Sequence, residues 1–282
     1  MNYKLFILIL ITLFFFSTSS ILARAALIEN YIDAFSFTFI RLLSGALVLL
    51  TILYFKEKKL DIGLKKNWIS SFMLFLYAIT FSYSYINLDA GLGALILFAV
   101  VQLFIIIFAL LKKESLTLQK GIGITLAFLG LFYLLFPEES ISLSFFHVCL
   151  MIVAGLAWGM YTILGKDCTN ALQHTADNFT KSLLFVGIFY LLFVSQTYMN
   201  FNGIALAFIS GGITSALGYA IWYYILPKIQ IITSGIIQLI VPPIAIFLGV
   251  LLLNEEFTFK LFISTDIILT GIAIAILSKK RI

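Results

Sequence analysis

Ten runs of predominantly apolar residues divide this chain almost from end to end, and they constrain its fold more than any other feature. A helix rises 1.5 Å per residue and the hydrocarbon layer of a bilayer is about 30 Å thick, so roughly 20 apolar residues cross it. The connections are short, the longest being 56–66 and 166–180, so we expect no inserted soluble domain. The runs cover about residues 5–23, 35–55, 67–86, 91–111, 118–136, 145–165, 181–199, 203–226, 231–253 and 261–278.

The composition supports the same class of protein. Of the 282 residues, 62% are hydrophobic and 11% are charged, whereas soluble domains carry about 25% charged residues. This excludes a soluble globular domain and a disordered chain, and the two cysteines, Cys149 and Cys168, are too few for a disulfide scaffold. We therefore predict an all-α membrane protein with ten transmembrane helices.

The positive charges predict the orientation of the chain. If the N-terminus is cytoplasmic, 15 of the 18 Lys and Arg residues fall on the cytoplasmic side, as the positive-inside rule requires. An even number of helices then places both termini in the cytoplasm. The net charge of +5 follows this topology, so we expect the bilayer as the partner of these cations and no nucleic acid.

The chain also repeats itself at an offset of 141 residues. The polar and glycine matches carry most of the weight, because apolar matches are common in such a sequence. They pair Tyr83 with Tyr224, Glu114 with Glu255, Thr117 with Thr258 and Gly130 with Gly271. Each repeat holds five helices, and an odd number means that the second enters the membrane inverted. We expect one repeat over 1–137, the second over 145–278, and a basic cytoplasmic tail over 279–282.

Several motifs recur in a particular order over these two repeats. They are Phe39–Leu43 around Arg41, Leu110–Thr117 running on to Gly130, Ala154–Tyr161, Gly218–Tyr224, Gln238–Pro242 and Leu251–Thr258. In this order they resemble the EamA family of the drug/metabolite transporter superfamily. The resemblance implies ten helices, a central pathway between the repeats, and transport of metabolites, often efflux of amino acids. One departure is Val101-Gln102, where fourth helices of the family often carry a proline.

Two buried amides are the first candidates for a substrate pathway, because polar groups inside a membrane need a partner. Gln102 lies midway along the fourth run and Gln238 in the ninth. An amide offers two donors and an acceptor, which suits a zwitterionic solute. The alternative is that each makes only an interhelical hydrogen bond.

Aromatic residues supply a second set of candidates. Trp158 and Tyr161 share one face of the sixth run. The further candidates are Tyr219, Trp222 and Tyr223 in the eighth run and Tyr83 in the third. Inversion would place the aromatic clusters of these two helices at opposite membrane faces, as a pair of gates would require. The alternative is an ordinary aromatic belt at both interfaces.

Two further features, a serine patch and a pair of prolines, remain open between a functional and a structural role. Ser17 and Ser20 belong to a polar patch in the first run and either line the pathway or bond back to their own helix. Pro242 and Pro243 should kink the ninth run and either act as a hinge or form a static bend.

Arg41 lies about 10 Å inside the outer end of the second run, at 1.5 Å per residue. Its buried guanidinium needs an anion. We expect a structural ion pair with Asp266, Asp33 or Glu29, and the alternative partner is a substrate carboxylate.

These features together predict a secondary transporter of a bacterial cytoplasmic membrane. It would move a small amino-acid-like, zwitterionic or aromatic solute, with export as the direction implied by the resemblance. The rivals are an importer of a nucleotide-like or cationic solute and a non-transporting scaffold or receptor. We expect no enzyme activity, because no convergent titratable side chains occur in the runs, and no cofactor or metal. The sequence leaves open whether the chain forms a homodimer.

Overall fold

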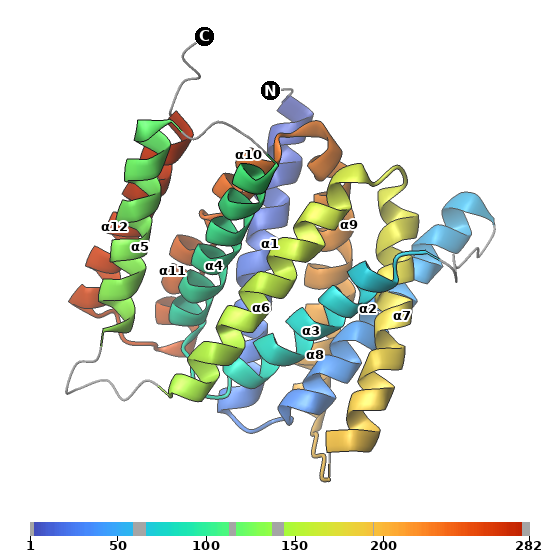
Figure 1. The fold of residues 1–282 in the computed structure, drawn as a ribbon. Coiled ribbons are helices and arrows are strands. Elements are labelled where there is room, and N and C mark those ends of the chain that lie inside the picture. The colour runs from blue at the N-terminus through green and yellow to red at the C-terminus, as the bar shows by residue number, and fades with distance from the viewer. Residues whose placement is uncertain (1–2, 59–65, 113–116, 137–143, 194, 278–282) are drawn as a thin grey trace.

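The computed structural model describes residues 3–58, 66–112, 117–136, 144–193 and 195–277. These residues form a bundle of helices, and the pairing between Ile32 and Met199 is an isolated bridge. Figure 1 shows the start of α1 and the end of α12 at the same end of the bundle. The helices are α1 (Tyr3–Ile28), α2 (Ala34–Glu57), α3 (Trp68–Ser84), α4 (Ala90–Leu111), α5 (Leu118–Leu135), α6 (Phe145–Leu164), α7 (Ala171–Phe193), α8 (Phe201–Ile209), α9 (Ala216–Ile225), α10 (Ile231–Gln238), α11 (Val241–Leu253) and α12 (Phe259–Leu277). Short 3₁₀ turns η1 (Gly165–Asp167) and η3 (Leu226–Lys228) extend α6 and α9, and a π-helical turn η2 (Ser210–Ser215) joins α8 to α9.

Six helical segments among the described residues are long and apolar enough to cross a membrane. They are Tyr3–Ile28, Ala34–Glu57, Ala90–Leu111, Phe145–Asp167, Phe201–Lys228 and Ile231–Leu253. Each of the ten predicted runs overlaps a helical segment, and the number of crossings remains a prediction. The tail expected over 279–282 lies outside the described residues.

The seventh run was placed wrongly at its start. It was predicted over 181–199, whereas α7 covers Ala171–Phe193. The first turns of α7 carry polar residues, and Thr175, Asp177 and Asn178 are all buried against other helices. Mean hydropathy missed this part of the helix because its polar side chains face the protein interior.

The ninth run is broken, as its two prolines predict. Helix α10 ends at Gln238 and α11 begins at Val241. Proline has no backbone N–H, so Pro242 and Pro243 leave the carbonyls of Gln238 and Leu239 without their usual helical donors.

Equivalent helices of the two halves pack against each other and run in opposite directions. On α2 and α7, Phe35 contacts Phe189, Gly45 faces Phe179, and Glu57 accepts a hydrogen bond from Asn170. Positions that rise along α2 therefore meet positions that fall along α7. The same holds for α4 and α11, where Gly91 faces Ile246 and Ala90 lies near Gly249.

The α5–α12 pair shows the same relation at atomic detail. Gly123 faces the backbone of Gly271 and Ala275, whereas Gly130 faces Ile268. Figure 1 shows the pair side by side at one edge of the bundle. An offset of 141 residues turns the contact of Gly130 with Ile268 into a contact of Gly271 with Ala127, and that contact is present. The two halves are therefore related locally by a two-fold rotation, so that equivalent helices run in opposite directions.

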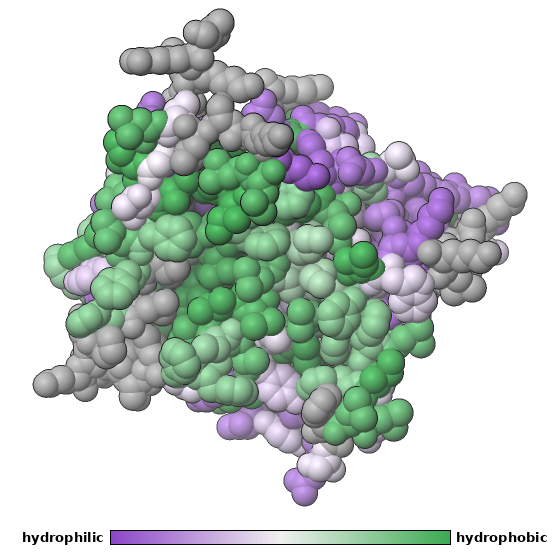
Figure 2. All heavy atoms as spheres, in the orientation of Figure 1, coloured by the Kyte–Doolittle hydropathy of each residue, from purple (hydrophilic) through white to green (hydrophobic). Residues whose placement is uncertain are grey.

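The surface of the bundle is apolar around its middle. Figure 2 shows hydrophobic residues across this part of the visible face and hydrophilic residues toward its upper and lower ends. Large apolar side chains such as Phe132, Leu191 and Phe247 are exposed on α5, α7 and α11. Such a band excludes a water-facing surface and fits a lipid environment, so the chain is a multi-pass membrane protein.

Candidate functional site

Seven aromatic side chains from both halves meet in the interior and form what we call the central aromatic cluster. They are Phe16, Tyr77, Trp158, Tyr161, Tyr219, Trp222 and Tyr223. The ring of Trp158 lies 4.9 Å from that of Tyr77 and 4.7 Å from that of Tyr219. Phe16 lies 5.2 Å from Trp158 with its ring perpendicular, a favoured geometry for aromatic pairs. The cluster thus joins α1, α3, α6 and α9.

Polar atoms of the cluster are paired within the protein. The indole Nε1 of Trp158 donates to Oε1 of Gln238 at 2.6 Å, and the hydroxyl of Tyr223 donates to the carbonyl of Tyr161 at 2.9 Å. The Trp222 indole donates to Thr162. The sequence candidates Trp158, Tyr161, Tyr219, Trp222, Tyr223 and Gln238 are therefore gathered in one place.

Arg41 reaches this cluster from α2, and its guanidinium is almost completely buried, at 1% exposed. Its Nε donates to the hydroxyl of Ser215 at 2.9 Å. Its Nη2 donates to the hydroxyls of Tyr219 at 2.7 Å, Ser19 at 3.0 Å and Tyr77 at 3.3 Å. Its Nη1 has no hydrogen-bond partner among the residues that the structure describes.

The π-helical turn η2 brings two of these hydroxyls, those of Ser215 and Tyr219, to Arg41. A Cβ atom on Gly211 would lie 2.0 Å from the carbonyl oxygen of Arg41 and 2.1 Å from Ser44 Oγ, so only glycine fits there. This close approach sets Ser215 and the following helix α9 beside the guanidinium. A π-helical turn inside a helix is rare and often marks a functional site.

The ion pair expected between Arg41 and Asp266 is not formed, and that prediction was wrong. Asp266 is exposed on α12, and the partners of Arg41 are hydroxyls. Asp33, the second expected partner, instead caps the N-terminus of α2 by accepting from the amide of Ser36 at 2.8 Å. Glu29, the third expected partner, is exposed, and the ion pairs among the described residues involve Arg24 and not Arg41.

The tyrosines of α3 are distributed differently from the prediction. Tyr83, the chosen candidate, packs edge-on against Phe189 of α7, whereas Tyr77 belongs to the cluster. The hydroxyls of Tyr77 and Tyr219 lie 3.2 Å apart, so one tyrosine of α3 meets one of α9 in the interior. A role of Tyr83 in a gate stays a prediction.

Gln102 is also placed away from the cluster. Its Oε1 approaches Gly235 of α10, and it borders a cavity of about 10 Å³ between α4, α5 and α12. Within the described part of the chain, neither its amide nitrogen nor its oxygen has a hydrogen-bond partner. The structure therefore does not bring Gln102 together with the other candidates.

The serines of α1 lie closer to the interior. Ser17 is fully buried and its hydroxyl lies 2.9 Å from the carbonyl of Leu13 and 3.2 Å from that of Val241, at the break between α10 and α11. Ser20 is buried as well. Ser19, which lies between them and is not among the predicted site residues, is the serine of α1 that accepts from Arg41.

Comparisons with known proteins agree with this arrangement. The profile of the EamA-like transporter family matches the chain twice, over residues 4–136 and 145–277. The chain belongs to this family. An uncharacterized protein of Pseudomonas aeruginosa is 41% identical over 92% of this chain and 90% of its own. The uncharacterized transporter YoaV of Bacillus subtilis is 23% identical over 84% and 85% of the two chains.

A solved structure supports the fold of this family member independently. A crystal structure with 15% sequence identity superimposes with a TM-score of 0.71 over 96% of this chain and 98% of its own. At that identity the likeness concerns the fold alone. An uncharacterized transporter of Archaeoglobus fulgidus, 26% identical over 96% of this chain and 97% of its own, extends the family relation. The EamA-like chain is therefore a membrane transporter.

An ion cluster that the sequence reasoning missed joins the two halves of this EamA-like chain near one end of the bundle. Arg24, at the end of α1, is 3.1 Å from Asp89 and 3.9 Å from Glu255. Its Nη1 also donates to the carbonyls of Tyr85 and Ile86 at the end of α3. We call Arg24, Asp89 and Glu255 the ion lock.

Glu255 also completes the N-terminus of α4. Its carboxylate accepts from the amides of Ala90 at 2.6 Å and Gly91 at 3.3 Å, which are among the unpaired donors of a helix start. Glu255 therefore serves a helix of the other half. Thr117 and Thr258, which the repeat pairs with each other, cap their own helices by accepting from the amides of Lys120 and Leu261.

A related contact occurs near the opposite end of the molecule. Lys166, which follows α6 as Arg24 ends α1, donates to the carbonyls of Leu226 and Ile229. The 141-residue offset relates Tyr85 to Leu226, so the same kind of cation closes the same helix end in both halves. The sequence held a signal for these contacts, because Arg24 and Lys166 stand near the ends of corresponding helices in the two halves.

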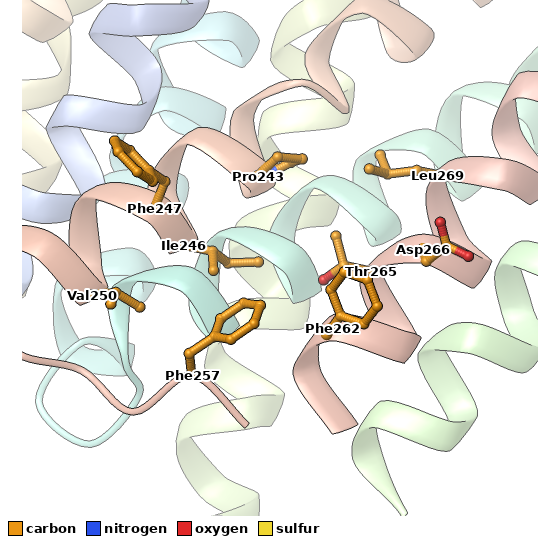
Figure 3. Close-up of a pocket in the computed structure, with 9 residues that line it drawn as sticks. All are labelled: Pro243, Ile246, Phe247, Val250, Phe257, Phe262, Thr265, Asp266 and Leu269. Carbon is orange, nitrogen blue, oxygen red and sulfur yellow. The ribbon is translucent and has the colours of Figure 1, made fainter. Parts of the chain in front are cut away.

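An apolar groove of about 490 Å³ lies between α11 and α12, apart from the residues of the central aromatic cluster. Figure 3 shows its lining side chains, which come from α11, the following segment and α12. Thr265 and Asp266 are the polar residues in this lining. A wall of this composition suits a lipid chain better than a polar solute.

Proposed function

We propose that the chain is a secondary transporter that moves a small metabolite across the bacterial cytoplasmic membrane. Two inverted five-helix repeats, 1–137 and 145–278, would cross it ten times with both termini in the cytoplasm. The substrate would be an amino acid or a related zwitterionic or aromatic compound, and the direction would be export. The pathway would pass through the interior between the repeats and open alternately to each side.

One observation carries this proposal, namely that the polar interior is built jointly by both halves. Ser19 and Tyr77 come from the first half, Ser215 and Tyr219 from the second, and all four bind the same side chain, Arg41. Polar groups inside a membrane are costly and typically mark a solute path. A site shared by two inverted halves is accessible from either side when the halves rock.

The contacts at the two ends supply the gates of this mechanism. The ion lock connects α1 of the first half to the 254–258 segment of the second, and Lys166 connects α6 to the end of α9. Opening one end would require its contacts to break while those at the other remain. The break at Pro242 and Pro243 would allow α10 and α11 to change their relative angle during this step.

Flux into proteoliposomes tests the proposal. Purified protein would be reconstituted and offered a panel of amino acids and nucleosides, with and without a proton gradient. We expect uptake of at least one amino acid above that of empty liposomes, and a reduction of at least tenfold in Trp158→Ala. Leu191→Ala, which removes a lipid-exposed side chain of α7, should transport like the wild type. If no amino acid is transported, the proposed substrate class is wrong.

A further inference from the structure

Arg41 carries a positive charge that the described protein does not neutralise. The salt bridges among the described residues involve Arg24, which is paired with two carboxylates. Arg41 is more deeply buried, at 1% against 7% exposed, and it has none. Burying an unpaired ion costs several kcal/mol in general, so such a residue inside a membrane requires an explanation.

The hydroxyls around Arg41 satisfy only part of its hydrogen-bonding capacity. A guanidinium has five N–H donors. Nε and Nη2 are occupied by Ser19, Tyr77, Ser215 and Tyr219, whereas Nη1 has no partner. Hydroxyl groups are neutral dipoles, so they orient the guanidinium without cancelling its charge. A net positive charge and the donors of Nη1 are left for a group that the described residues do not supply.

The geometry points to Arg41 as the binding site for the carboxylate of a transported solute. This inference rests on the proposed function and narrows its substrate to compounds with a carboxylate. A carboxylate fits because it carries one negative charge and its oxygens can accept charge-assisted hydrogen bonds from the N–H groups of Nη1. A phosphate monoester carries about −1.5 to −2 at neutral pH, whereas the described side chains that contact Arg41 are hydroxyls and aromatic rings and include no second cation to balance it.

The remainder of the solute would lie against aromatic rings. The guanidinium carbon of Arg41 lies 5.4 Å from the ring of Tyr77 and 4.7 Å from that of Phe81. Trp158 stands next to Tyr77 and Tyr219. A solute held at Nη1 therefore meets aromatic faces, which favour an apolar or aromatic side chain and also stabilise an ammonium group.

The site would become accessible through the movement of the repeats. The four hydroxyls that surround Arg41 come equally from the two halves, so a shift of one half against the other parts them and exposes the guanidinium. Recognition of the carboxylate would then be tied to the step that exchanges access between the two sides.

Binding to purified protein in detergent tests this inference with four probes that share a phenyl ring. 3-Phenylpropanoate and L-phenylalanine carry a carboxylate, phenethylamine lacks it, and phenyl phosphate carries a second charge. Affinity would be measured by quenching of tryptophan fluorescence. In the wild type we expect the two carboxylates to bind at least tenfold more tightly than phenethylamine and phenyl phosphate, and this comparison needs no variant.

Variants then assign the selectivity to Arg41. Arg41→Gln should weaken both carboxylates at least tenfold and leave phenethylamine unchanged, and Arg41→Lys should retain part of the preference. Lys112→Gln, which removes a cation at the end of α4, should behave like the wild type. Equal affinity for phenethylamine, tighter binding of phenyl phosphate, absence of binding by both carboxylates, or unchanged binding in Arg41→Gln would overturn the inference.

The two proposals fail in different experiments. Carboxylate binding that depends on Arg41 without any flux in proteoliposomes would support the site and contradict transport. Amino-acid flux without a carboxylate preference would support transport and contradict the role of Arg41.

Discussion

Gln102 and Gln238 are buried amides on neighbouring helices, and the sequence offered no reason to treat them differently. The structure separates them clearly. Gln238 accepts from Trp158 and donates to the carbonyl of Ser234, so its amide is bonded at both ends. The amide of Gln102 finds no hydrogen-bond partner at either atom in the described ranges of the chain. Residue type predicted burial of a polar group, but its partners depend on helix rotations of a few tens of degrees, which sequence spacing does not determine.

Replacing each glutamine by leucine tests this difference. Gln102→Leu removes two unsatisfied polar atoms at similar volume, and we expect a gain in stability on the order of 1 kcal/mol. Gln238→Leu leaves the Trp158 indole without an acceptor, and we expect a loss of about 1–3 kcal/mol. Thermal unfolding in detergent would measure both. A Gln102→Leu variant that melts below the wild type would show that this amide is satisfied, for instance by a water molecule in the adjoining cavity.

At the scale of elements, the apolar runs predicted the helix positions because a helix that crosses the hydrocarbon layer needs a continuous apolar stretch. The start of α7 did not, since its buried polar residues, including Thr175 and Asn178, lower the local hydropathy. The π-helical turn η2 was missed as well. Its sequence, Ser210–Ser215, has no feature that distinguishes a π turn from an α-helix, and only packing of Gly211 on Arg41 explains it.

The α5–α12 contact depends on glycine at one position and not at its neighbour. A Cβ on Gly123 would lie 2.3 Å from the carbonyl oxygen of Gly271, whereas a Cβ on Gly121 would meet nothing within 4 Å. We expect Gly123→Ala to destabilise the protein by about 1–3 kcal/mol through overpacking. Gly121→Ala should stabilise it by about 0.5–1 kcal/mol through helix propensity. Melting temperatures would show this pair of opposite signs, and equal shifts would contradict the packing of the two helices.

The ion lock predicts that the stability of the protein depends on pH through the titration of Glu255. Burial raises the pKa of its carboxyl above 4.5, against the opposing effects of the Ala90 and Gly91 amides and of Arg24. The folded state then holds the proton more tightly than the unfolded state. Between the unfolded pKa and the raised pKa, unfolding releases a proton, so the contribution of Glu255 to stability falls as pH rises.

Glu255→Gln should remove this dependence. We expect the melting temperature of the wild type to fall relative to that of Glu255→Gln as the pH rises from 4.5 to 7. Glu256→Gln, which changes the exposed neighbour, should leave the pH profile parallel to that of the wild type. A parallel profile for Glu255→Gln would contradict the assignment.

For the whole molecule, the repeat of 141 residues was the most informative sequence signal. It predicted two five-helix halves, and the antiparallel contacts of α2 with α7, α4 with α11 and α5 with α12 agree with inversion. The interior was harder to predict. Tyr77 and Tyr219 come from different halves and meet in the interior, and their contact depends on how the halves pack against each other.

Access to the interior from both sides of the membrane is the central claim, and a single cysteine at position 215 tests it most directly. Cys149 and Cys168 would first be replaced by serine, and Ser215→Cys would then be exposed to a membrane-impermeant thiol reagent in right-side-out and in inside-out vesicles. Because Ser215 lies at Arg41 between the two halves, alternating access predicts labelling in both preparations. Labelling from one side alone, or from neither side, would contradict the account.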